Sequence, residues 1–267
     1  VYNSKVVYIT KNVAINEKAA SEILLAFKCT TKIVGGKGKP VLSAILQRIT
    51  FDMLISYTNK YFIKPPQPKP KHTQPVPPNQ QSYPQQQPQY NSRNSISPID
   101  DTYLEAEIVS QMSTLCKLIG RLAQTRKGSD EISRVAPIKV RQQIYSVLGS
   151  RGFCKDNHQT IDKMAKYIFE NALKYRQFNS DEKHREFCYK AVDVVKKFVH
   201  LYFRLQAQEP VPEYSYFFEA GVPLQNSVMD GSWDDENMDN LEVEICSFPL
   251  ISIKSKDNSR KILSKAV

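Results

Sequence analysis

The chain has 267 residues, of which 41% are hydrophobic and 24% charged, with a formal net charge of +10. This length and composition suit one or two globular domains with a hydrophobic core. They exclude a membrane-spanning helix, because no run approaches the roughly 20 apolar residues that cross a bilayer.

The ends and the cysteines indicate where the protein resides. The first residues do not form a signal peptide, which argues against secretion. Five scattered cysteines include no Cys-x-x-Cys pair, so we expect a reducing, intracellular compartment, the cytoplasm first, with mitochondrial association or the nucleus as alternatives. The chain starts with valine rather than methionine, so we expect a piece of a longer gene product.

The excess positive charge is confined to the first part of the sequence. Residues 1–98 contain thirteen Lys and Arg against three acidic residues, whereas residues 99–267 contain twenty-four of each. Attraction to a polyanion is therefore expected of the N-terminal segment.

Residues 65–98 form a Pro/Gln-rich stretch that holds ten of the sixteen prolines and almost no aliphatic residues. This composition cannot bury enough surface to fold, so it predicts a disordered linker. A spacer explains the stretch more simply than a docking site for a proline-reading domain. The prediction is thus two domains, residues 1–64 and residues 99–267.

The N-terminal segment predicts a small β-α-β-α unit. Lys5–Thr10 is rich in β-branched and aromatic residues, and Asn16 is suited to cap the helix that follows. Thr30–Val34 predicts a second strand, and Pro40 suits the first turn of a second helix.

Residues 99–267 predict a helical bundle followed by a small β segment. Apolar residues keep helical spacing over residues 104–122, 161–172 and 187–202, and a further helix is expected from Pro137 to Gly149. Residues 214–218 and 241–253 are strand-like, separated by the acidic loop 229–240. The expected fold class is therefore α+β.

The strongest candidate site is the sequence GGKGKP, which lies between a predicted strand and a predicted helix. Gly36 and Gly38 let backbone N–H groups approach an anion, the helix N-terminus supplies a positive dipole, and Lys37 and Lys39 add charge. The motif lacks the Gly-Lys-Ser/Thr ending of a Walker A loop. Phosphate binding, supported by basic residues such as Arg48, stands against the alternative of a glycine-rich turn with two solvated lysines.

The order of strand, Lys11, helix, strand, Gly36–Pro40 and second helix resembles the Alba family of small basic DNA- and RNA-binding proteins over residues 5–54. The resemblance implies that Lys11, Lys37 and Lys39 contact the sugar-phosphate backbone of RNA or DNA, without base discrimination. The long β-hairpin that follows the second helix in this family is short or missing here, since prolines begin at Pro65.

The end of the sequence carries a second resemblance. The segments Leu205–Pro212, Leu241–Leu250 and Ile262–Val267 are similar to the C-terminal domain of the mitochondria-eating protein family. The chain departs from that family where Val211 interrupts a Pro-Pro pair and Phe248 replaces the usual Trp. The resemblance implies a role at mitochondria or in binding membrane lipids.

Two Cys/His pairs are candidate zinc ligands. Cys154 and His158, and likewise His184 and Cys188, stand four residues apart, so each pair could share one helical face. The ordinary finger spacing is absent, and cysteines beside phenylalanines are more often buried as small hydrophobic residues. We therefore assign no metal, expect no cofactor and nominate no catalytic residue.

The sequence favours a non-enzymatic adaptor that binds RNA or DNA through Lys11, Gly36, Lys37, Gly38, Lys39 and Arg48. Residues 99–267 would bind a protein or a mitochondrial membrane lipid, and homodimerisation is left open. The alternative is a mitochondrial quality-control or lipid-binding scaffold that acts through residues 99–267. An enzyme built on the helical domain is a third hypothesis, for which the sequence indicates no substrate.

Overall fold

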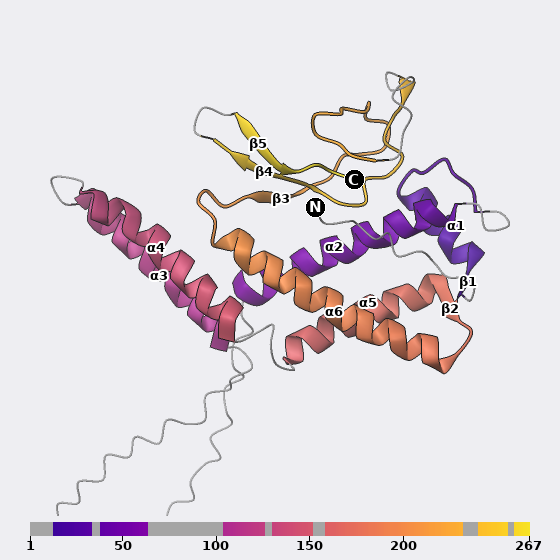
Figure 1. The fold of residues 1–267 in the computed structure, drawn as a ribbon, viewed down its shortest axis with the longest axis horizontal. Helices are drawn as coiled ribbons and strands as arrows, with labels where there is room; N and C mark the ends of the chain where they lie inside the picture. The colour runs from indigo at the N-terminus through magenta and orange to yellow at the C-terminus, as the bar shows by residue number, and fades with distance from the viewer. Residues whose placement is uncertain are drawn as a thin grey trace, which may run out of the picture.

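The computed structural model describes residues 13–33, 38–63, 104–125, 130–151, 158–231, 240–255 and 259–267. These residues form mostly helices, with a two-stranded and a three-stranded antiparallel sheet (Figure 1). The expected α+β class with a helical bundle is confirmed.

The N-terminal part contains the short strand β1 (Val13–Ile15) and the helices α1 (Glu17–Ala26) and α2 (Lys39–Ile63). Asn16 caps α1 as predicted, because its side chain accepts a hydrogen bond from the backbone N of Ala19. The strand expected at residues 30–34 is wrong, since residues 30–33 form no strand. The strand expected at residues 5–10 lies outside the described residues.

The bundle consists of α3 (Leu104–Thr125), α4 (Glu131–Arg151), α5 (Gln159–Tyr175) and α6 (Asp181–Gln206), close to the predicted helices. The boundaries expected for α4 are wrong: it begins six residues before Pro137 and continues through Gly149. It begins early because the carboxylate of Asp130 accepts a hydrogen bond from the backbone N of Ser133, which caps the helix.

Two small sheets complete the described fold. β1 pairs antiparallel with β2 (Arg176–Phe178), which joins the N-terminal part to the turn between α5 and α6. The second sheet has the order β3 (Glu213–Tyr216), β4 (Leu250–Lys254) and β5 (Arg260–Ser264). The strand expected over residues 241–253 is shorter than predicted, because residues 241–249 contribute only an isolated bridge from Glu242 to Pro223.

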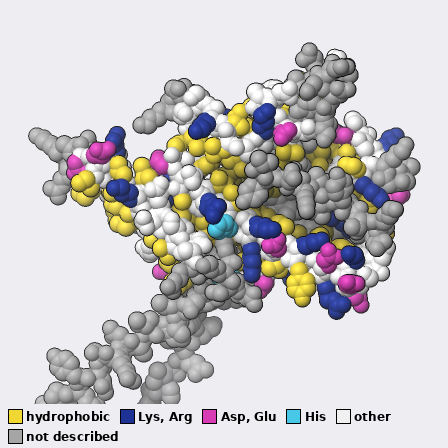
Figure 2. Space-filling model, viewed as in Figure 1, with side chains coloured by type: hydrophobic (Ala, Val, Ile, Leu, Met, Phe, Trp, Pro, Cys, Tyr) yellow, Lys and Arg dark blue, Asp and Glu magenta, His cyan; other side chains and the backbone are white. Residues whose placement is uncertain are grey.

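The helices α3 and α4 form an antiparallel hairpin that projects from the rest of the protein (Figure 1). The space-filling view shows hydrophobic side chains at the surface of this projection, with charged side chains between them (Figure 2). Among the exposed hydrophobic residues of the hairpin are Leu118 of α3 and Ile132 of α4.

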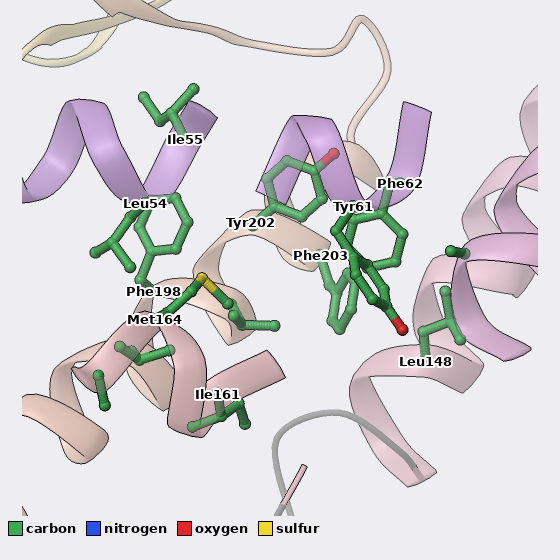
Figure 3. Close-up of a cluster of buried hydrophobic side chains, with 14 of the residues drawn as sticks. Leu54, Ile55, Tyr61, Phe62, Leu148, Ile161, Met164, Phe198, Tyr202 and Phe203 are labelled. Carbon is green, nitrogen blue, oxygen red and sulfur yellow. The ribbon is translucent and has the colours of Figure 1, made fainter. Parts of the chain in front are cut away.

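The main core is built from both sides of the predicted linker. Phe62 of α2 stacks on Tyr202 of α6, and its ring lies edge-on to Phe203, with 5.7 Å between centroids in each pair (Figure 3). The ring of Phe51 of α2 lies edge-on to the rings of Phe198 and Phe248. The sequence predicts residues 1–64 as a separate domain, whereas this packing joins α2 to the bundle in one core.

The distribution of buried residues along α2 explains why this helix belongs to the bundle core. Its buried side chains lie on two different faces, one near the start of the helix and one along the rest, so one neighbouring helix cannot cover them. Near its start, Leu42 and Ile45 pack against α1, while residues 51–62 pack against the bundle. Helix α2 therefore runs through the protein as a shared element.

Candidate nucleic-acid interface

The start of α2 is the part of the predicted phosphate site that the structure describes. Gly38 has a φ of +84°, and its carbonyl accepts the hydrogen bond of the backbone N of Leu42, which opens the helix. A Cβ atom at Gly38 would lie 3.1 Å from the carbonyl oxygen of Lys32. Glycine is therefore required here, both for the left-handed backbone and for the close approach of residues 31–33.

Two lysines, Lys39 and Lys32, are placed at this helix start by the local chain path, and Lys28 precedes them in the chain. Lys39 is the first residue of α2, and the first turn of the helix contains no acidic residue. Lys32 is exposed on the segment that touches Gly38, and Lys28 is exposed just after α1. The free N–H groups of a helix start and its positive dipole end add to these charges. This arrangement suits a phosphate.

The other predicted site residues are placed differently. Lys11, Gly36 and Lys37 lie outside the described residues. The guanidinium of Arg48 lies over the rings of Phe27 and Phe217, at 5.4 and 4.7 Å from their centroids. Arg48 is thus half-buried in cation–π contacts that join α2 to α1 and to the segment after β3, a packing role that does not favour the expected phosphate contact.

Glu244 is a neighbour of the site that sequence reasoning missed. Its carboxylate accepts hydrogen bonds from the backbone N of Thr31 at 2.8 Å and from the hydroxyls of Thr31 and Thr30 at 3.0 and 3.3 Å. Burial raises the pKa of Glu244, but these hydrogen bonds lower the pKa by more, so it lies below the ordinary glutamate value. Glu244 therefore stays ionised and fixes the segment before Gly38.

A cavity of about 540 Å³ lies beside the start of α2. Pro40, Ala44 and Gln47 form part of one wall, and residues 241–247 together with the C-terminal residues form much of the rest. Its lining is largely apolar and includes the acidic side chains of Glu242 and Asp230. These charges disfavour a second phosphate inside the cavity, so the candidate interface is the outer, lysine-bearing side of the helix start.

The two histidines among the zinc candidates have structural roles. Nδ1 of His158 accepts a hydrogen bond from the backbone N of Thr160 and caps α5, while its Nε2 lies 3.4 Å from the carboxylate of Glu105. The ring of His184 packs edge-on against Phe169 at 4.5 Å between centroids. Cys154 lies outside the described residues, and Cys188 is a free thiol. Within the described ranges, no group of three His, Cys, Asp or Glu side chains could hold a metal ion.

Comparisons with known proteins found no match to this chain among family models, curated proteins or solved structures. Within the described part of the chain, every helix is too short or too polar to cross a membrane.

Proposed function

We propose that the protein is a non-enzymatic adaptor that binds RNA or DNA by its phosphates at the start of α2, while the helical bundle engages a further partner. The observation that carries the proposal is the concentration of positive charge before residue 99, together with the glycine-opened, acid-free start of α2. Lys28, Lys32 and Lys39 supply the charges that the described residues contribute. Lys11 and Lys37 extend this set in the sequence.

Contacts of this kind are made to the sugar-phosphate backbone. Lysine is a point charge on a flexible stem, and helix N–H groups point at one anion, so neither reads the edge of a base. The proposed binding is therefore independent of nucleotide sequence and strongly dependent on salt. Glu244 keeps its negative charge beside the site, where Thr31 and Thr30 hold its carboxylate by hydrogen bonds. This single charge stands against those of Lys32 and Lys39, so the local balance stays positive.

The test is binding of the full chain to fluorescent single-stranded RNA and duplex DNA across a salt series. The full chain is needed because α2 shares its core with the bundle. Each lost phosphate contact reduces the slope of log K against log salt by about 0.9 for duplex DNA, so Lys32→Ala with Lys39→Ala should reduce it by roughly 2. The matched control is Lys60→Ala, an exposed lysine in the last turn of the same helix.

Three outcomes would contradict the proposal. The first is no binding at low salt, and the second is an unchanged slope in the double variant. The third is a loss of slope of about 1 in Lys60→Ala, half that of the double variant, which would show that total charge rather than the start of α2 determines binding.

The alternative, a scaffold at mitochondrial membranes, has its support in the C-terminal resemblance. Residues 99–267 carry equal numbers of basic and acidic residues, which provides little attraction to anionic lipid. Flotation of the full chain with liposomes that contain or lack cardiolipin separates the two functions. Lipid binding that survives Lys32→Ala with Lys39→Ala would favour the scaffold.

A further inference from the structure

One face of α3 packs against α4. Val109, Met112 and Cys116 follow helical spacing and pack into the main core or against it. The thiol of Cys116 donates a hydrogen bond to the carbonyl of Pro137 in α4 at 3.4 Å, which shows that this face is turned to α4. The hairpin therefore needs only this stripe of α3 for its own packing.

A second apolar stripe on α3 is largely exposed. Leu115, Leu118 and Leu122 have 47%, 52% and 52% of their surface exposed, although they lie three and four residues apart on one face. Leu104, which is 39% exposed, continues this stripe toward the body, together with Ile108, which is half-buried and packs against the main core. We call these five residues the leucine stripe. Its spacing is that of the a and d positions of a coiled coil.

We propose that the leucine stripe is the dimer interface of this protein and that its occupant is the leucine stripe of a second copy, running antiparallel. In that direction, the residues near one end of the stripe lie opposite residues near the other end of the partner's stripe. Leu122 meets the partner's Leu104, Leu118 meets the partner's Ile108, and Leu115 meets the partner's Gln111, with each layer repeated by the two-fold axis. With α4 on each outer side, the two hairpins form a four-helix bundle.

The charges beside the stripe select the antiparallel direction. Glu107 near the start of α3 and Arg121 near its end are both exposed, on the flank of the stripe away from α4. Neither side chain forms an ion pair within the described residues. An antiparallel copy brings Glu107 to the partner's Arg121 twice, whereas a parallel copy keeps Glu107 and Arg121 at opposite ends of the helix pair.

The stripe is long enough for a specific contact. Leu104 to Leu122 spans eighteen residue steps, which at about 1.5 Å per residue is roughly 27 Å of helix. The hairpin projects from the body (Figure 1), and Leu115, Leu118 and Leu122 have about half of their surface exposed. Dimerisation uses neither α2 nor the lysines of the proposed nucleic-acid interface, so it is independent of that function.

The first test is sedimentation of the full chain across a wide concentration series, without nucleic acid. The wild type should shift with concentration from the 30.6 kDa of one chain to twice that mass. Leu118→Glu should remain monomeric throughout, with unchanged helical circular dichroism because the side chain is exposed. The matched control is Leu25→Glu on α1, which is 74% exposed and should still dimerise.

A charge exchange tests the direction of the pair. Glu107→Arg and Arg121→Glu should each weaken self-association about tenfold or more, because each creates two like-charge pairs per dimer. An equimolar mixture of the two variants should regain wild-type association as a heterodimer. A wild type that stays monomeric, a Leu118→Glu variant that still dimerises, or a mixture that shows no recovery would each overturn the proposal.

Discussion

Phe62 offers a direct measure of how firmly α2 is built into the bundle. Its side chain is 2% exposed, and it stacks on Tyr202 and meets the edge of Phe203, both of α6. Truncation to alanine removes these contacts and leaves a cavity that the surrounding aromatic rings cannot fill. Phe62→Ala should therefore lower the free energy of unfolding by about 3–5 kcal/mol.

The assay combines urea unfolding, followed by far-UV circular dichroism, with hydrogen exchange of the α6 amides. If α2 and α6 unfold together, the whole transition moves to lower urea and exchange in α6 accelerates at least roughly 100-fold. Leu25→Ala, at an exposed site of α1, should change stability by less than about 0.5 kcal/mol. An early, separate transition with unchanged exchange in α6 would refute the shared core and restore two independent domains.

Two further predictions concern the segment around the start of α2. Gly38→Ala should destabilise the protein by about 1–3 kcal/mol in urea unfolding, because alanine is strained at a φ of +84° and its Cβ would press on the Lys32 carbonyl. Because the folded pKa of Glu244 is depressed, its contribution to stability is present at neutral pH and lost below about pH 4. Unfolding midpoints of Glu244→Gln should accordingly depend less on pH than those of the wild type between pH 7 and about pH 3.

The candidate site was predicted only in part. The turn residue Gly38 and the helix start at Lys39 follow from local chemistry, since glycine precedes a lysine and a proline suited to a first turn. Arg48 was assigned to phosphate because it is basic, yet its neighbours are the rings of Phe27 and Phe217. A charge in a sequence does not reveal whether aromatic rings will cover it. No sequence pattern indicates the contact of Glu244 with this site, because Glu244 and Thr31 are 213 residues apart in the sequence.

By itself, the sequence determined the α+β class, the approximate positions of the helices and the cap at Asn16. These features depend on the spacing of apolar residues and on neighbours within about one helical turn, which any single chain displays. Tertiary structure alone decided that residues 30–33 form no strand, that α2 belongs to the bundle core and that most of the leucine stripe of α3 is exposed. Periodicity identifies an apolar face, but whether another segment of the chain covers that face depends on contacts between residues far apart in the sequence.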